Sequence, residues 1–103
     1  MKYTVNLSDK ANKDTDEIFE YISTVLCEKE AAVNMINLLQ ESILSLDEMP
    51  GRYRLYENEL WKKRGVHIMP VKKYLVFYLI DDETKTVNVI RVIYASRDYE
   101  KIF

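Results

Sequence analysis

Residues 74–95 read YLVFYLIDDETKTVNVIRVIYA, and this stretch decides the class of fold. Residues 74–80 are almost continuously apolar, which is typical of a strand that is buried on both faces. Residues 86–95 are rich in β-branched side chains and are also apolar on both sides, which predicts a second central strand. The polar turn at 81–85 is short enough to favour antiparallel pairing of the two strands. The C-terminal half of the chain therefore predicts the centre of a sheet.

The segments before this sheet predict one more strand and a first helix. Residues 3–7 alternate apolar and polar side chains, which is the period of a half-buried strand. Ser8 or Asp9 can then cap a helix. The predicted core stripe of that helix has the spacing i, i+3, i+4, i+7 and consists of Ile18, Tyr21, Ile22 and Val25.

A second helix follows after the pattern shifts near residues 27–30. Its apolar side consists of Ala32, Met35, Ile36, Leu39, Ile43 and Leu46. Pro50 ends it, because proline lacks the backbone donor and disfavours helical geometry at the preceding residue. The short connection makes the two helices an antiparallel hairpin. With a further strand near 66–69, the order is β-α-α-β-β-β, and the class is α+β, a helical hairpin packed on one face of a small, mostly antiparallel sheet. The tail, residues 96–103, can add a short terminal helix.

Length and composition predict a single domain over residues 1–103. Apolar residues make up 48% of the chain and charged residues 31%, which is the composition of a soluble globular protein. No stretch approaches the roughly 20 apolar residues that span a membrane, and the N-terminus lacks the apolar segment of a secretory signal. Cys27 is the one cysteine, so an internal disulfide is excluded and the cytoplasm is the expected compartment. We expect Cys27 to pack as a hydrophobic residue on a helix.

The charge is distributed unevenly along the chain. The first 50 residues hold 4 Lys and Arg against 10 Asp and Glu, whereas residues 51–103 hold 11 against 7. This asymmetry suggests one face suited to an anionic partner, although two ordinary solvated surfaces would give the same count. The net charge of −2 argues against tight, non-specific binding of nucleic acid. One His and one Cys predict no metal site, and the chain has no glycine-rich phosphate loop, so no cofactor is expected.

Four sets of residues resemble one known family in their order along the chain. DEIFEYI at 16–22 resembles the family's first helix. Ala31-Ala32 and the run Ile43, Leu46, Met49-Pro50 resemble its second helix. Trp61 and Gly65-Val66, followed by YLVFYLID at 74–81, resemble its second and third strands. RVIYASRD at 91–98 resembles its last strand with the Arg-Asp signature that follows. Together these segments, which cover nearly the whole chain, resemble the RelE/ParE superfamily of toxins from bacterial type II toxin–antitoxin modules, which includes plasmid stabilisation proteins.

The resemblance implies a growth-inhibiting toxin that is held inactive by a cognate antitoxin, whose C-terminal segment wraps around it. Some family members cleave mRNA on the ribosome, and others, the ParE-like members, poison DNA gyrase without known catalytic residues. The nucleases place basic residues on the second, third and last strands. In this sequence His67 stands at the second-strand position and Arg97 near the last strand, but Tyr74 takes the place of the third-strand arginine. These departures favour a ParE-like, non-enzymatic inhibitor of gyrase.

Two alternatives stay open. One is a ribosome-dependent, metal-independent mRNA endonuclease in which His67 and Arg97 are catalytic. The other is a degenerate, non-toxic relative or an unrelated binding module. In every case the expected partners are macromolecules, an antitoxin together with gyrase or the ribosome and its mRNA, rather than a small molecule or a membrane.

The candidate residues for binding the target or the antitoxin are basic and aromatic, and they are Lys62, Lys63, Arg64, Arg91, Tyr94, Arg97 and Tyr99. A charge on a central strand must reach an open or bound face or be paired, so Arg91 can either contact a partner or form a structural ion pair. The lysine run can contact phosphates or simply be solvated. We expect the antitoxin to cover the sheet face that the helices leave exposed, because apolar strand residues there need shielding.

Overall fold

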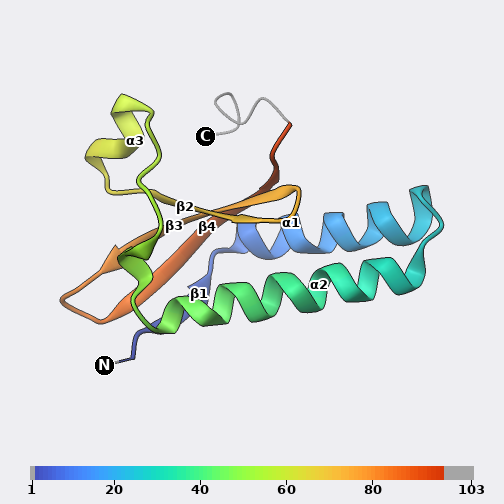
Figure 1. Cartoon of the computed structure of the whole chain (residues 1–103), viewed down its shortest axis with the longest axis horizontal. Helices are drawn as coiled ribbons and strands as arrows, with labels where there is room; N and C mark the ends of the chain where they lie inside the picture. Colours follow the sequence, from blue (N-terminus) through green and yellow to red (C-terminus); the bar gives the residue numbers. More distant parts are fainter. Residues whose placement is uncertain (1, 97–103) are drawn as a thin grey trace.

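The computed structural model describes residues 2–96, without the side chain of Leu60. The elements follow the predicted order, with one short helix added before the second strand (Figure 1). Their bounds are β1 Thr4–Leu7, α1 Asp9–Glu20, a π-helical turn Tyr21–Val25, α2 Lys29–Leu44, 3₁₀ turns Ser45–Asp47 and Pro50–Arg52, α3 Glu59–Lys63, β2 His67–Val71, β3 Tyr74–Asp81 and β4 Thr86–Tyr94. The α+β class is therefore confirmed, and the predicted terminal helix at 96–103 falls almost wholly outside the described residues.

The four strands form one mixed sheet in the order β1-β4-β3-β2. β3 pairs with β4 in the antiparallel sense from Tyr74↔Tyr94 to Asp81↔Thr86, as the turn length predicts. β1 joins the other side of β4 in the parallel sense. The register shifts between Phe77 and Tyr78, which face Arg91 and Val89 respectively, so that Ile90 is the extra residue of a bulge.

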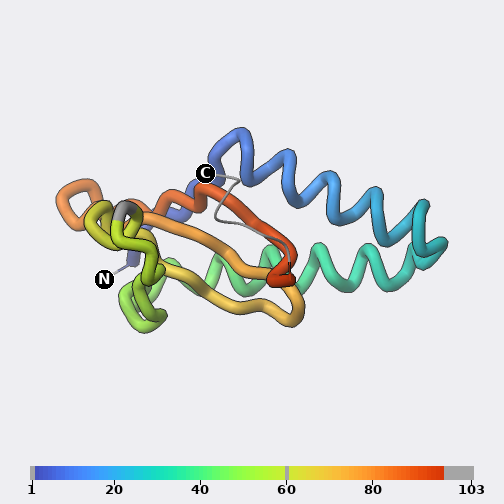
Figure 2. The backbone as a smooth tube through the Cα atoms, turned by 90° about the horizontal axis from the view of Figure 1, so that it is seen from above, coloured from blue at the N-terminus to red at the C-terminus, as the bar shows by residue number. Residues whose placement is uncertain are grey.

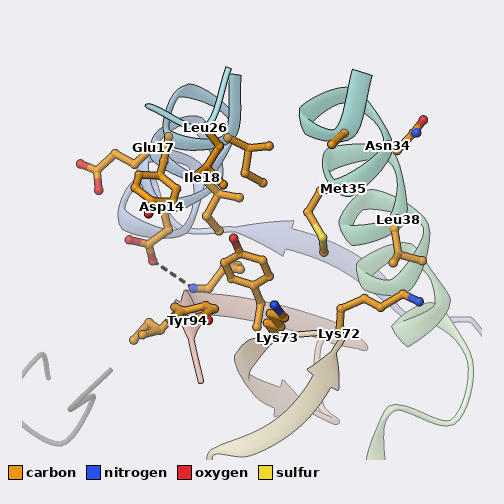
Figure 3. A pocket seen from close by; sticks show the side chains of 16 residues that line it. Asp14, Glu17, Ile18, Leu26, Asn34, Met35, Leu38, Lys72, Lys73 and Tyr94 are labelled. Atoms are coloured by element: carbon orange, nitrogen blue, oxygen red, sulfur yellow. Dashed lines mark hydrogen bonds between the residues drawn. The ribbon is translucent and has the colours of Figure 1, made fainter. Parts of the chain in front are cut away.

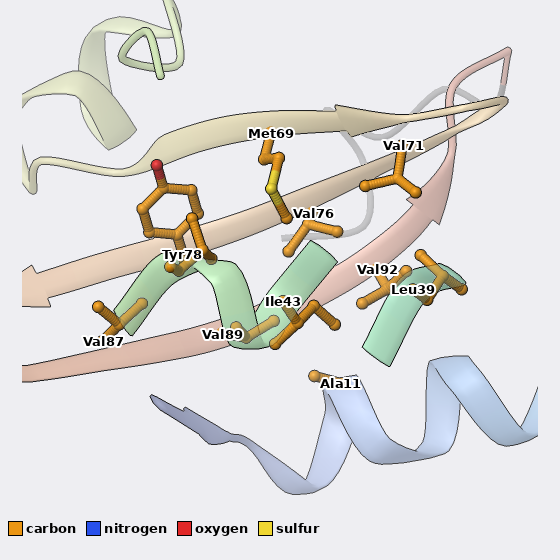
Figure 4. Close-up of a cluster of buried hydrophobic side chains, with 11 residues drawn as sticks. Ala11, Leu39, Ile43, Met69, Val71, Val76, Tyr78, Val87, Val89 and Val92 are labelled. Atoms are coloured by element: carbon orange, nitrogen blue, oxygen red, sulfur yellow. The ribbon is translucent and has the colours of Figure 1, made fainter. Parts of the chain in front are cut away.

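The two long helices cover one face of this sheet. Ser8 caps α1, as expected, because its hydroxyl accepts the backbone N–H of Ala11 at 3.0 Å. Beneath the helices lies the larger hydrophobic core, which the helices and the strands line together (Figure 4). Its buried members are Ala11, Leu39, Ile43, Leu46, Met69, Val71, Val76, Tyr78, Val87, Val89 and Val92.

The opposite face of the sheet is not left bare. A second buried cluster there joins Tyr56 and Val66 to Ile68, Phe77 and Ile93, and Trp61 packs against it. α3 lies on this side, across the sheet from α2 (Figure 1). The segment between α2 and β2 therefore folds back over the face that was expected to be left for the antitoxin, and whether the antitoxin also covers it stays a prediction.

The helical hairpin extends past the end of the sheet (Figure 2). Tyr21, Val25 and Leu26 in this overhang are 52%, 65% and 50% exposed, although Tyr21 and Val25 belong to the predicted core stripe. Ile22 alone of that stripe is buried, since the sheet ends before it can cover the rest. Cys27 also departs from expectation, because it is exposed and turns the chain between the helices with φ of 54°.

None of the described helices is both long and apolar enough to cross a bilayer. Within residues 2–96 there is also no group of three or more His, Cys, Asp or Glu side chains that could hold a metal ion.

Candidate functional site

An open apolar groove lies between the overhanging hairpin and the adjacent end of the sheet (Figure 3). Its volume is about 1050 Å³. Apolar and aromatic side chains line most of it, and they are Ile18, Tyr21, Ile22, Leu26, Ala31, Met35, Leu38, Tyr74, Val92, Ile93 and Tyr94. Polar side chains at its rim are Asp14, Glu17, Asn34, Lys72 and Lys73. A hollow of this kind binds an apolar surface better than it binds water.

Two aromatic residues at the end of the sheet form the floor of the groove. Tyr74 and Tyr94 face each other across β3 and β4, with their rings 5.6 Å apart and edge to face. Burial raises the pKa of Tyr74, and the neighbouring hydroxyls of Tyr94 and Tyr21 raise it further. The phenol of Tyr74 therefore stays neutral, which suits an apolar floor with a hydrogen-bonding tip.

The wall beside Tyr94 is held by a pair of opposite charges. Asp14 on α1 accepts hydrogen bonds from Nε and Nη2 of Arg91 at 2.8 and 2.9 Å. The same carboxylate accepts the backbone N–H of Val92 at 2.9 Å. The side chains of Arg91 and Asp14 are only 15% and 10% exposed. The hydrogen bond from Arg91 to Asp14 raises the pKa of Arg91, so the guanidinium stays charged.

β4 needs this carboxylate because β1 ends early. The last pair between the two strands is Leu7↔Val89, which leaves the outer edge of β4 without a strand neighbour from Ile90 onward. Ser8 supplies the first hydrogen bond along this edge, since its hydroxyl donates to the carbonyl of Ile90 at 3.0 Å. Asp14 supplies the next one, because its carboxylate accepts the N–H of Val92. The start of α1 thus replaces the missing strand and fixes one wall of the groove.

The residues predicted for binding do not form one site. Tyr94 lines the groove and is 42% exposed. Arg91 lies next to the groove but is engaged by Asp14, which is the structural alternative that the sequence left open. Lys62, Lys63 and Arg64 are exposed on and after α3, on the other side of the sheet. Arg97 and Tyr99 lie outside the described residues.

His67 lies apart from all of these, at the start of β2. Its Nδ1 is 2.8 Å from the carbonyl oxygen of Tyr53, which can only accept, so Nδ1 carries the proton. Its ring stacks on Tyr78 at 5.3 Å between centroids. The imidazole is held between the loop and the sheet, and only its Nε2 can make other contacts.

Sequence reasoning missed most of the groove. Four of the helical side chains that line it belong to the predicted core stripes, because an apolar stripe does not reveal where the sheet below it ends, and they are Ile18, Tyr21, Ile22 and Met35. Lys72 and Lys73 lie in the tight turn between β2 and β3, where Lys72 has a φ of 55°. The adjacent pair of lysines between two apolar strands was the available signal for a charged rim.

One known protein family matches nearly the whole chain. The family described as ParE toxin of type II toxin-antitoxin system, parDE, matches residues 5–99. The chain belongs to the ParE toxin family. It is therefore a toxin of a type II toxin–antitoxin system, as the resemblance implied. Among curated proteins, none matches the chain.

Chains in solved toxin–antitoxin structures share this fold. The chain is similar to one from the chromosomal ParDE system of P. aeruginosa, with 17% identity and a TM-score of 0.74, covering 90% of this chain and 96% of that one. It is also similar to one from the RelBE2 complex of Mycobacterium tuberculosis, with 22% identity and a TM-score of 0.70, covering 94% and 95%. A mutant of the E. coli toxin RelE in the free state matches at 17% identity and a TM-score of 0.59 over 100% of both chains.

Proposed function

We propose that this toxin inhibits growth by binding DNA gyrase without cleaving RNA. The observation that carries this choice is that the arginine and the histidine on the described strands are already engaged by other groups of the protein. Arg91 is tied to Asp14, Nδ1 of His67 is bound to a carbonyl, and Tyr74 stands where the related nucleases carry arginine. A cation that neutralises phosphate in a transition state must be free to reach it. The family match over most of the chain supports a ParE-like mode of action.

The target is tested with purified chain in a gyrase supercoiling reaction. We expect inhibition that rises with toxin concentration and disappears when the cognate antitoxin is added. In parallel, ribosome-bound mRNA is incubated with the same preparation, and its cut sites are mapped. Codon-positioned cuts that are lost in His67→Ala or Arg97→Ala would instead establish the endonuclease. A preparation that affects neither reaction, with no growth defect on induced expression, would show a non-toxic relative.

We propose that the groove receives an apolar segment of the cognate antitoxin. Tyr21, Leu26 and Tyr94 are each about half exposed, and an amphipathic helix laid between the hairpin and the sheet would bury them together. The rim charges set an orientation. Lys72 and Lys73 at one side suit acidic residues of the bound segment, whereas Glu17 on α1 suits a basic one.

Two leucines on the helical hairpin give a matched test of the groove. Leu26 lines the groove, whereas Leu44 lies at the end of α2 outside it, and they are 50% and 62% exposed. We expect Leu26→Glu to weaken antitoxin binding at least about 10-fold, because it places a charge in the apolar contact, and Leu44→Glu to leave affinity unchanged. Calorimetric titration with the antitoxin measures both. Equal affinities of the two variants would remove the groove from the interface.

A further inference from the structure

The segment between α2 and β2, which packs on the side of the sheet away from the helical hairpin, carries four exposed cations. We call Arg54, Lys62, Lys63 and Arg64 the basic ridge. Two backbone hydrogen bonds hold the segment that carries the ridge. The N–H of Tyr56 donates to the carbonyl of Val66 at 2.7 Å, and the N–H of Ile68 donates to the carbonyl of Arg54 at 3.0 Å. The ridge is therefore carried by backbone that is bonded to the edge of the sheet.

The basic ridge carries more positive charge than its own segment neutralises. Residues 54–64 contain the 4 Lys and Arg of the ridge and 2 acidic residues, Glu57 and Glu59. All four ridge side chains are exposed, and within residues 2–96 none of them forms an ion pair. Arg52 is not part of the ridge, because its guanidinium is occupied by the carbonyls of Ser45, Glu48 and Met49.

Aromatic packing shapes one end of the ridge. The guanidinium of Arg64 lies over the ring of Trp61, 5.0 Å from its centre. Trp61 is itself packed against the second buried cluster, so the ring is a fixed support. An exposed guanidinium beside an aromatic ring suits both stacking on a base and bonding to a phosphate.

The distribution of acidic residues favours the ridge over the outer face of the helices for binding a polyanion. The exposed acids of α1 and α2, such as Asp16, Glu20 and Glu30, lie on the other side of the sheet. A polyanion is therefore repelled by the acidic outer face of the helices and attracted to the ridge. The net charge of −2 does not prevent this, because the two signs of charge lie on different faces. Adjacent cations and a guanidinium beside a packed aromatic ring match a nucleic-acid strand better than an acidic peptide, which offers no bases to stack.

We propose that the basic ridge binds the phosphate backbone of nucleic acid in the complex that the toxin attacks. The inference goes beyond the proposed function, because both gyrase and the ribosome hold nucleic acid and the ridge makes no choice between them. The ridge would add a contact that does not depend on the nucleotide sequence to the contact between the toxin and its protein target. It is separate from the groove, which lies beside the helical hairpin.

The test measures binding of fluorescein-labelled oligonucleotides by anisotropy at several salt concentrations. The probes are duplex DNA, single-stranded DNA and single-stranded RNA of about 20 nucleotides, long enough to pass the ridge. Four phosphate contacts predict a slope of log affinity against log salt of about −3.6 on duplex DNA, which is a loss of roughly 100-fold between about 50 and about 200 mM salt. The three probes separate a DNA contact from an RNA contact.

The variant Lys62→Ala/Lys63→Ala/Arg64→Ala leaves one ridge cation, so the slope should fall to about −0.9 and the loss over the same range to about 4-fold. The matched control Lys10→Ala/Lys13→Ala/Lys29→Ala removes the same charge from exposed positions on α1 and α2 and should keep the original slope. Thermal unfolding of both variants checks that they remain folded. Absence of binding at about 50 mM salt, or equal slopes for the two variants, would overturn the proposal.

Arg64→Lys tests the stacked guanidinium separately. It keeps the charge, so the salt slope should be unchanged, while affinity for single strands should fall several-fold relative to duplex DNA. If the triple ridge variant loses antitoxin binding and keeps nucleic-acid binding, the ridge belongs to the protein interface and the proposal fails.

Discussion

Asp14 takes the place of a strand neighbour along the outer edge of β4. Its two oxygens satisfy one backbone N–H and two guanidinium N–H groups at once. Because the pair with Arg91 is nearly buried, losing one partner removes the closest opposite charge from the other. The stability of this wall of the groove therefore depends on a single carboxylate.

Asp14→Asn should lower the free energy of unfolding by about 3 kcal/mol, since asparagine keeps the shape but not the charge. The exposed Asp16→Asn on the same helix should change it by less than about 0.5 kcal/mol. Urea denaturation measures both. Adding Arg91→Met to Asp14→Asn should recover most of the loss, because the nearly buried cation that Asp14 neutralised is then removed as well. A cost for Asp14→Asn no larger than that of the Asp16 control would show that the pair is not stabilising.

Tyr78 links the core to the loop before β2. Its ring is fully buried and its hydroxyl donates to the carbonyl of Pro50. Burial raises the pKa of Tyr78 well above the ordinary value of 10.0. The folded state thus keeps this phenol protonated to a higher pH than the unfolded chain does.

This shift predicts a pH dependence of stability at alkaline pH. The contribution of Tyr78 is complete below about pH 10, where the unfolded phenol is also protonated, and is lost as the pH rises further, at about 1.4 kcal/mol per pH unit. Tyr78→Phe should cost about 1–3 kcal/mol at neutral pH, because the Pro50 carbonyl loses its donor. Above about pH 10 the difference between the two proteins should shrink. Urea denaturation at a series of pH values measures this, and parallel curves would refute it.

At the scale of elements, the helical hairpin extends beyond the end of the sheet (Figure 2). The π-helical turn Tyr21–Val25 adds one residue to a helical turn, with the N–H of Leu26 bonded to the carbonyl of Tyr21 at 3.1 Å. A wide turn of this kind rotates the side chains that follow it, and Leu26 consequently lines the groove. The overhang is thus a structured part of the hairpin rather than a frayed helix end.

The connection from α3 to β2 depends on a backbone conformation. Gly65 has φ of +78°, and a Cβ there would meet no atom within 4 Å. Gly65→Ala should therefore cost about 1 kcal/mol through backbone strain alone. Gly51→Ala is the matched control, because its surroundings are equally open and its φ is not positive, and it should be neutral within about 0.5 kcal/mol. Denaturation followed by the fluorescence of Trp61 reports both, and equal stabilities would contradict the assignment of strain.

At the scale of the whole molecule, the sheet is covered on both sides by its own chain. The two hydrophobic clusters lie on opposite faces of β3 and β4, and the groove leaves a large apolar area open beside them. The free toxin should therefore keep its sheet without a partner. Apolar surface that needs a partner is concentrated where the hairpin overhangs.

Hydrogen exchange should show this distribution directly. Amides in the middle of β3 and β4 should exchange slowest in the isolated chain, and those between Tyr21 and Cys27 among the fastest. Addition of antitoxin should slow exchange along the groove and leave the sheet centre nearly unchanged. Fast exchange in β3 and β4 that slows only with antitoxin would mean that the chain does not shield its own sheet.

Much of the fold could be read from local pattern. The apolar runs around Phe77 and Val89, the alternation before Ser8 and the stripes of the two helices each report which side chains avoid water, and such periods specify element type. The family resemblance added the order of the elements and the class of protein. These features depend on neighbours in the sequence, so the sequence contains them.

The tertiary structure alone decided where apolar stripes stop being core and become a groove. Tyr21 and Leu39 are both apolar side chains on helices, but one overhangs the sheet and the other lies above it. It also decided that Arg91 is paired, because Asp14 is 77 residues away in the chain. Local periodicity says which face of an element is apolar, but only the packing of distant elements determines what covers it.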